Sequence, residues 1–164
     1  MVYKFKNIEH NISIIIPHNC IESMLQELIN YYPNEFGGIL VGVRNKSQSI
    51  VVDFLTPSNF KISKNRFIRD SGNLNEELEK IYDLSVGKLE YLGEWHSHPN
   101  GNEKFSTGDK KTMLKIASDT DVGFNFPFLL IFSLNTNGYD YKIYVTIENQ
   151  LIELKKQYPH EQSS

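Results

Sequence analysis

The feature that most constrains this 164-residue sequence is an apolar strand that runs directly into two histidines. Residues 89–95 have the composition of a strand, and His96-Ser97-His98-Pro99 follows without a break. Side chains alternate along a strand, so His96 and His98 are predicted to lie on one face. Pro99 ends the strand and places the pair at the edge of a sheet rather than in its middle.

A predicted helix over residues 106–117 begins shortly after the two histidines, beyond a loop rich in Gly and Asn. Ser106 and Asp109 have the spacing of a capping box, with Ser106 as the N-cap. The short loop allows this helix to return the Asp109 carboxylate to the histidines. Two histidines and one carboxylate leave one position of a tetrahedral zinc ion open, which is the catalytic rather than the structural arrangement.

Each half of this pattern also has a purely structural interpretation. His-x-His at a strand end is commonly two ordinary polar residues, and Ser-x-x-Asp is commonly only a helix cap. A helix cap and a metal site can use the same residues, because a cap fixes the rotamer that a metal ligand needs. The whole pattern arises by chance much less often than either half, and this favours a metal site.

Strand alternation also places Leu92 and Glu94 on the histidine face, and Trp95 and Ser97 on the opposite face. Glu94 is therefore a candidate to orient a ligand histidine, although a partly exposed place at the sheet edge explains it equally. Trp95 is interpreted as a core residue rather than as a platform for a substrate.

The rest of the sequence predicts one domain of the α/β (α+β) class. Helices are expected over residues 20–31, with Asn19 as the cap, and over 74–84. Strands are expected over residues 12–16, 39–43, 49–55, 128–134 and 139–147, with the second and third of these as a hairpin. Residues 56–72 are expected to form a loop. The predicted domain covers residues 1–154, and residues 155–164 are predicted to form a flexible C-terminal tail.

Composition and charge exclude several classes of protein. The formal net charge is −3, whereas binding to nucleic acid or to an anionic membrane needs a basic patch. The most apolar run, residues 122–134, contains Asn125 and Pro127 and is too short to span a bilayer. Cys20 is the single cysteine, so no intrachain disulfide can form, and the N-terminus lacks a signal-peptide pattern. We therefore expect a cytoplasmic protein, with Cys20 as a small packing residue.

The joint motif resembles the signature of the JAMM (MPN-plus) zinc metalloprotease family. That signature begins with His-Ser/Thr-His-Pro. Seven residues separate its second His from a Ser, and an Asp stands three positions after that Ser. This chain matches every position up to Asp109. The family also has a glutamate before a glycine-rich strand, which resembles Glu35 followed by Gly37 and Gly38. The resemblance covers about residues 14–147. It implies a single JAB/MPN-like domain with a mixed, mostly antiparallel, curved sheet flanked by helices.

The resemblance also implies a role for each residue of the motif. His96, His98 and Asp109 would hold one Zn2+ per chain, with water at the fourth position. Zinc lowers the pKa of such a water from 15.7 toward about 7. Glu35 would be the general base and would pass the proton to the leaving amine. Ser106 would help to stabilise the tetrahedral oxyanion.

A prokaryotic branch of the family, associated with mobile elements and antiviral operons, resembles this chain at Gly93-Glu94-Trp95-His96 and at residues 66–70. Family substrates end in Gly-Gly tails, among them ubiquitin-like proteins and, in bacterial defence systems, a signalling enzyme joined to its target. The implied function is a deubiquitinase-like isopeptidase that cuts after such a tail. A conjugating enzyme and a nucleotidyltransferase of the same operon are the implied partners. Arg66 and Arg69 are candidates to grip the tail, although surface arginines commonly only face water.

Three alternative functions remain open. A protease that releases the tail of a sulfur-carrier protein would use the same chemistry. A non-catalytic MPN scaffold would only bind partners, but scaffolds of this kind usually lack a ligand, and none is missing here. A mononuclear iron oxygenase also uses two histidines and one carboxylate, but in the order His-x-Asp/Glu and then a distant His.

Overall fold

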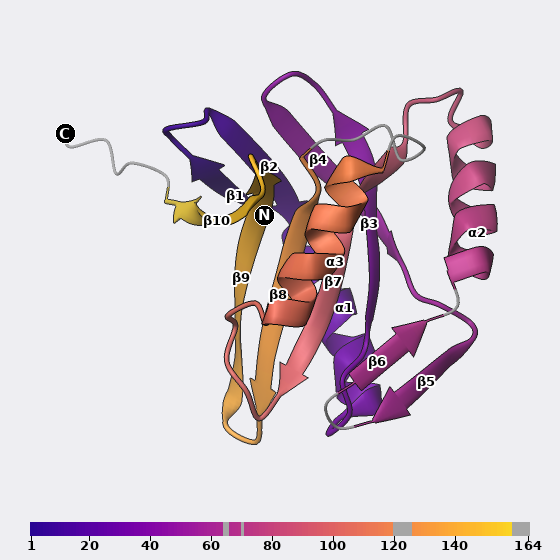
Figure 1. Cartoon of the computed structure of the whole chain (residues 1–164), viewed down its shortest axis with the longest axis vertical. Helices are drawn as coiled ribbons and strands as arrows, with labels where there is room; N and C mark the ends of the chain where they lie inside the picture. Colours follow the sequence, from indigo (N-terminus) through magenta and orange to yellow (C-terminus); the bar gives the residue numbers. More distant parts are fainter. Residues whose placement is uncertain (64–65, 70, 120–125, 159–164) are drawn as a thin grey trace.

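The main sheet has eight strands: β1 (Val2–Asn7), β2 (Ile12–Pro17), β3 (Gly37–Arg44), β4 (Gln48–Leu55), β7 (Glu90–Pro99), β8 (Phe128–Asn135), β9 (Gly138–Ile147) and β10 (Gln150–Gln157). They curve into a closed barrel in the order β1-β10-β9-β8-β7-β3-β4-β2 (Figure 1). Neighbouring strands are antiparallel, except that β2 runs parallel to β4 and β7 parallel to β8. The computed structural model describes residues 1–63, 66–69, 71–119 and 126–158, and the side chains of residues 62–72 lie outside this description.

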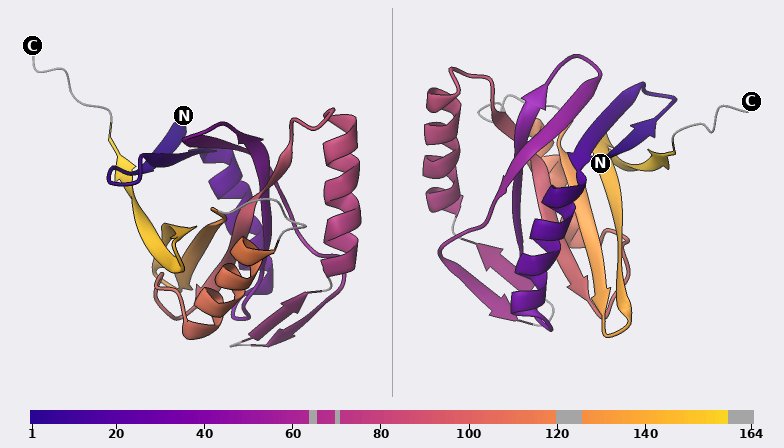
Figure 2. Two further views of the ribbon diagram at one scale, coloured as in Figure 1. Left: turned by 45° about the horizontal axis from the view of Figure 1, so that its top comes forward. Right: turned by 180° about the vertical axis from the view of Figure 1, so that it is seen from behind.

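Helices cover both faces of the curved sheet (Figure 2). Helix α1 (His18–Tyr31) packs on the inner face, where Met24 and Leu28 join the largest core cluster with Trp95. Helices α2 (Ser71–Leu84) and α3 (Thr107–Ser118) pack on the outer face, each over its own smaller apolar cluster. The sequence prediction of an α+β domain with a mixed, mostly antiparallel sheet is confirmed.

The predicted helices, the hairpin β3–β4 and the strands β2, β7, β8 and β9 are present, but the start of α1 differs from the prediction. The helix begins at His18, and its N-cap is Pro17, which makes no side-chain capping bond. Asn19 lies inside the first turn, so its assignment as the cap was wrong. The reason is that β2 leads into α1 without a loop, and the extended backbone of Pro17 itself makes the turn (φ −60°, ψ 142°).

Residues 56–72 do not form the expected continuous loop. They contain strands β5 (Phe60–Ser63) and β6 (Arg66–Arg69), which pair as a separate two-stranded antiparallel sheet. The strands are four residues long and rich in charged side chains, so their alternation of apolar residues is hard to distinguish from loop composition. Figure 1 shows this hairpin beside the lower end of β3 and β7.

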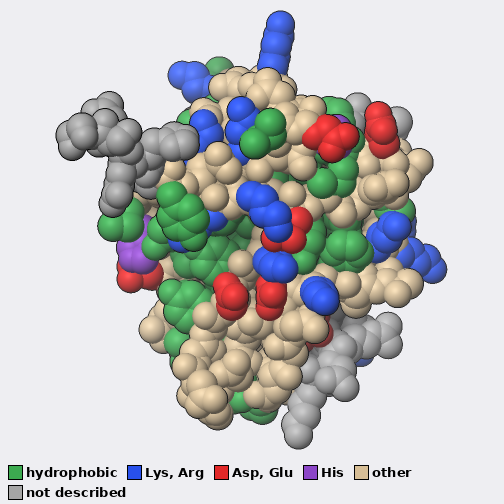
Figure 3. All heavy atoms as spheres, turned by 90° about the vertical axis from the view of Figure 1, so that its left-hand side faces the viewer, with side chains coloured by type: hydrophobic (Ala, Val, Ile, Leu, Met, Phe, Trp, Pro, Cys, Tyr) green, Lys and Arg blue, Asp and Glu red, His purple; other side chains and the backbone are tan. Residues whose placement is uncertain are grey.

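The barrel is closed by two strands that the sequence did not predict, β1 and β10. Lys155 of β10 pairs with Lys6 of β1, so residues 155–157 belong to the barrel and the predicted boundary at 154 was too early. The remainder of the predicted tail, residues 159–164, lies outside the described residues. Positive and negative side chains are interspersed on this side of the molecule (Figure 3). Among the described residues, no helix is long and apolar enough to cross a membrane.

A β-bulge in β7 changes the alternation of side chains along this strand. Gly93 pairs with Leu40 of β3, but the next pair is Tyr91 with Val41, so Leu92 is an additional residue. Leu92 therefore joins Trp95 in the inner core, and the prediction that Leu92 shares the histidine face was wrong. Beyond the bulge the predicted alternation holds.

Candidate metal centre

Two histidine rings meet at the C-terminal end of β7. His96 and His98 pair with Ile131 and Ser133 of the parallel strand β8, and this register turns both rings to the outer face. Their Nε2 atoms are 3.1 Å apart. Both side chains are mostly buried, with 12% and 18% of their surface exposed. The predicted pairing of these two side chains is thus present.

Asp109 reaches the two histidines from the first turn of α3. Its Oδ1 lies 3.2 Å from His96 Nε2, and its Oδ2 lies 3.5 Å from His98 Nε2. The capping box holds this carboxylate in place: Ser106 N donates to Oδ2 (2.6 Å), and Asp109 N donates to Ser106 Oγ (3.1 Å). Burial acts to raise the pKa of Asp109, but hydrogen bonds from His96 and His98 outweigh it and hold this pKa far below its usual value. Asp109 is therefore an anion at any pH near neutrality.

A backbone carbonyl fixes the orientation of the His98 ring. Nδ1 of His98 lies 2.9 Å from Asn102 O. A carbonyl oxygen only accepts, so Nδ1 carries the proton and Nε2 of the neutral ring offers its lone pair to the cluster. Burial lowers the pKa of His98, but hydrogen bonds to Asp109 and Asn102 raise it more, so the net shift is upward. A metal ligand needs this tautomer. The role of Asn102 cannot be read from its residue type, because the contact uses no side-chain atom of that residue.

Glu35 approaches the same point from the residue pair just before β3. One carboxylate oxygen of Glu35 and one ring nitrogen each of His96 and His98 lie within 4.8 Å of one another. Burial raises the pKa of Glu35; the histidines lower it and Asp109 raises it, but burial dominates. A carboxyl group with a raised pKa can exchange a proton near neutral pH more easily than an ordinary glutamate.

Two glycines allow the close approach of β3 to its neighbours β7 and β4. Gly37 pairs with His96, and a Cβ at Gly37 would lie 2.0 Å from Trp95 O and 2.6 Å from His96 Cβ. A Cβ at Gly38 would lie 1.8 Å from Leu55 O. A side chain at Gly37 would push β3 away from β7, and one at Gly38 would push it away from β4.

The donor set fits a tetrahedral zinc ion. Nitrogen and oxygen ligands about 2.0–2.1 Å from a tetrahedral zinc lie about 3.3 Å from one another. The three separations among His96, His98 and Asp109 are 3.1, 3.2 and 3.5 Å. Glu35, His96 and His98 also form a group that could hold a metal, since one ligand atom of each lies within 4.8 Å of the others. The contacts of its two carboxylate oxygens with both histidine Nε2 atoms make Asp109 a candidate for the third ligand.

A hollow of about 170 Å³ lies beside this cluster, and its lining includes Glu35, His96 and three residues of α3, which are Asp109, Thr112 and Met113. Ser106, an exposed residue, accepts the Asp109 N–H with a lone pair, so its hydroxyl proton can be donated elsewhere.

The other predicted site residues have less definite surroundings. Glu94 also lines the hollow, and its Oε1 accepts a hydrogen bond from Tyr91 Oη (2.8 Å). Arg66 and Arg69 lie in β6, and their side chains are outside the described residues. The roles predicted for these three residues therefore remain predictions.

Comparison with known proteins identifies the family of this chain. The model of the family described as prokaryotic homologues of the JAB domain matches residues 17–144. A "CD-NTase/cGAS isopeptidase" of Enterobacter hormaechei is 31% identical over 122 residues, which are 73% of this chain and 66% of that protein. The protein of the same name from Vibrio cholerae is 26% identical over 117 residues, covering 70% of this chain and 75% of the relative.

Two further similarities are more distant. A "probable metalloprotease" of Sinorhizobium fredii is 27% identical over 89 residues, about half of each chain (53% and 54%). The solution structure of a protein from Desulfitobacterium hafniense superposes with a TM-score of 0.62 at 24% identity, over 84% of this chain and 87% of that one. This last similarity concerns the fold alone.

Proposed function

The chain belongs to the family of prokaryotic homologues of the JAB domain, and on this premise we propose that it is a zinc-dependent isopeptidase acting on a protein conjugate. The observation that carries the proposal is the set of short separations among His96, His98 and Asp109, 3.1–3.5 Å. A shared cation would bring two imidazole Nε2 atoms and a carboxylate oxygen this close together.

His96, His98 and Asp109 would hold the zinc ion, and Glu35 would act as the base. Bound zinc would supply a Lewis acid that polarises the substrate carbonyl and makes water acidic at neutral pH. Glu35 would accept a proton from the attacking water and give it to the leaving amine. The amide C–N bond breaks, the products are a carboxylate and an amine, and Glu35 ends the cycle ionised as it began.

Ser106 would donate its hydroxyl proton to the developing oxyanion. It stands at the N-terminus of α3, one residue before the helix, where backbone N–H groups also favour negative charge. The capping contact with Asp109 N holds the Ser106 side chain in a fixed place.

The relatives suggest the substrate class. Two of them are named CD-NTase/cGAS isopeptidases, so we propose that the substrate is a nucleotidyltransferase joined through its C-terminal tail to a target amine. A conjugating enzyme would then be the functional partner. A Gly-Gly tail lying as an extended strand would suit the narrow hollow beside the cluster. Arg66 and Arg69 of β6 would contact this tail.

Two other functions are weaker. A non-catalytic scaffold needs neither the ligands nor a half-buried glutamate beside them, and this chain has all four side chains together. Release of a sulfur-carrier tail would use the same site, and the choice between it and deconjugation is a question of substrate.

The test is hydrolysis of a fluorogenic peptide whose C-terminal Gly-Gly is joined to the ε-amine of a lysine. Glu35→Gln should keep zinc and fold but lose about 100- to 10,000-fold in kcat, the range for general acid–base catalysis. Glu94→Gln should lose only about 10- to 100-fold, as residues that orient a ligand do. His96→Ala and Asp109→Ala should lose both zinc and activity. Full activity after removal of zinc by a chelator would exclude the proposed function, and an active Glu35→Gln would exclude Glu35 as the base.

A further inference from the structure

Ser97 lies between the two histidines but points to the opposite face of β7. It is 1% exposed, so its hydroxyl must find its partners inside the protein. Those partners are the backbone groups of Phe36: Phe36 N donates to Ser97 Oγ (3.2 Å), and Ser97 Oγ lies 3.4 Å from Phe36 O. The backbone of Ser97 adds a third contact, because Ser97 N donates to Phe36 O at 2.9 Å.

Phe36 is the residue directly after Glu35. The regular pairing of β3 with β7 begins one residue later, at Gly37 opposite His96. The contacts of Ser97 therefore extend the attachment of this segment by one residue beyond the ladder, to Phe36, whose nitrogen is bonded to the Glu35 carbonyl carbon.

The ring of Phe36 is also held in place, by burial and by contacts with other aromatic rings. Phe36 is 1% exposed and stacks on Tyr31 at 3.9 Å between ring centroids. Phe60 of β5 and Trp95 of β7 meet its edges at 5.1 and 6.4 Å. With the ring fixed by aromatic contacts, the remaining freedom of this segment is rotation of the backbone between residues 35 and 36, and the Ser97 hydroxyl limits this rotation.

From these contacts we propose that Ser97 is a positioning residue for catalysis, whose hydroxyl fixes the backbone at Phe36 and thereby holds the Glu35 carboxylate beside the metal ligands. The inference rests on the proposed function of Glu35 as the base. One hydroxyl group is decisive here because a base that is misplaced by about 1 Å can lose about 100-fold in rate. Ser97 itself touches neither the ligands nor the hollow.

This assignment makes a definite prediction about which changes are tolerated. Ser97→Ala removes the acceptor of the Phe36 N–H in a buried place, so the segment must shift to satisfy that group. Ser97→Thr keeps the hydroxyl. Ser97→Cys keeps nearly the same volume but replaces the hydroxyl by a weak hydrogen-bonding group.

The experiment compares kcat, KM, zinc content and melting temperature of these variants with the fluorogenic Gly-Gly isopeptide, at a temperature well below every melting point. Ser97→Ala should lose about 10- to 100-fold in kcat, with KM changed less than about threefold, because the residues that line the hollow are unchanged. Zinc content should stay at the wild-type level. Ser97→Thr should restore most of the rate. The matched control is Ser49→Ala, which removes another buried serine, on β4, and should leave kcat unchanged.

The outcomes separate the two proposals. If Glu35→Gln is inactive but Ser97→Ala has the same kcat as Ser49→Ala, the positioning role is excluded and the proposed function stands. If Glu35→Gln is fully active, Glu35 is not the base and both fail together. Should Ser97→Ala not fold, Ser97→Cys replaces it, and an unchanged kcat in that variant excludes the positioning role equally. A drop in zinc content that matches the drop in kcat would instead assign Ser97 to the metal site.

Discussion

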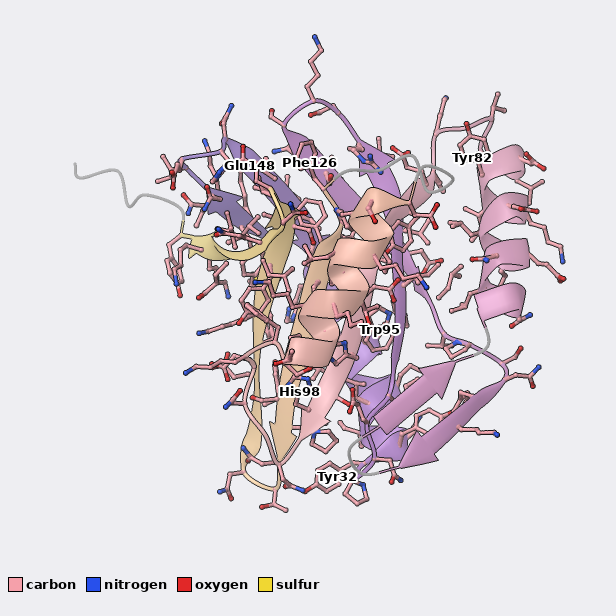
Figure 4. The ribbon with its side chains drawn as sticks, viewed as in Figure 1. Tyr32, Tyr82, Trp95, His98, Phe126 and Glu148 are labelled. Carbon is pink, nitrogen blue, oxygen red and sulfur yellow. The ribbon has the colours of Figure 1, made fainter. Side chains whose placement is uncertain are left out.

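The hydroxyl of Tyr32 donates a hydrogen bond to Asn100 Oδ1 over 2.7 Å, and joins the loop before β3 to the loop after β7. Tyr32 and His98 lie at the same end of the molecule (Figure 4). Asn100 is itself fixed, because its N–H donates to Leu134 O of β8 at 2.6 Å. The bond thus links the segment that precedes Glu35 to the segment that follows His98.

Tyr32→Phe should lower kcat a few-fold without loss of zinc, because only one attachment of the Glu35 segment is removed. The bond is exposed, so the loss of stability should be at most about 1 kcal/mol. Steady-state kinetics and thermal unfolding of the same samples measure both effects. Tyr82→Phe, an exposed tyrosine on α2 far from this loop, is the control. Identical kinetics for the two variants would show that the Tyr32 bond has no part in turnover.

Ser106 has a structural and a proposed chemical role, and two substitutions separate them. Ser106→Ala should cost about 1 kcal/mol of stability through the lost cap, whereas Ser106→Gly should cost only a few tenths. Both lack the hydroxyl, so both should lose about 100- to 1000-fold in kcat if it stabilises the oxyanion. Chemical denaturation and single-turnover rates measure the two quantities. A normal rate in Ser106→Gly would leave Ser106 only its capping role.

Gly37→Ala should be strongly destabilising, by about 3 kcal/mol, because the new Cβ would lie 2.0 Å from Trp95 O. The displacement of β3 from β7 should also reduce zinc binding. Gly108→Ala is the matched control, since a Cβ there would meet only Ser106 Oγ at 3.6 Å, and alanine favours the helix by about 1 kcal/mol. Urea denaturation of both variants is the measurement. A Gly37→Ala protein as stable as Gly108→Ala would mean that β3 can move without cost.

As pH rises, the metal-free protein should become less stable, whereas the zinc-loaded protein should become more stable. The raised pKa of His98 stabilises the fold below its unfolded value of 6.5, and this contribution is lost as pH rises through the folded value. The depressed pKa of Asp109 stabilises the fold above 3.8, and this is lost only as pH falls through its folded value. The metal-free protein should therefore lose stability from pH 6 to pH 8.5.

Zinc reverses this trend because it competes with the proton on His98 Nε2. At a fixed free zinc concentration the melting temperature should rise with pH over the same interval. Calorimetric titrations in buffers of different ionisation enthalpy should show proton release on zinc binding near pH 6.5. Equal pH slopes with and without zinc would mean that His98 is not a ligand.

The local part of the site was predictable from the sequence, and the long-range part was not. His96 and His98 follow from strand alternation, and Asp109 follows from the helix start that Ser106 marks. Glu35 is distant in sequence, and only the family resemblance identified it.

Contacts that use backbone atoms cannot be predicted from the types of the residues that make them. The carbonyl of Asn102 and the attachment of Phe36 to Ser97 belong to this class. Leu92 was assigned to the wrong face because alternation assumes a regular strand, whereas the register of β7 depends on its partner β3. Strands β1 and β10 escaped prediction since few of their side chains are buried, and β5 and β6 since each is only four residues long.

The pairing of β1 with β10 would allow the elements to follow one another in a different order along the chain. Lys4 lies opposite Gln157, so the end of β10 is beside the start of β1. A short polar linker between these strands, with a new opening at the exposed turn around Lys46, would give a circular permutant. That opening lies at the end of β3 opposite to Glu35. The barrel should accept this rearrangement with its metal ligands undisturbed, so that connectivity and site can be varied independently.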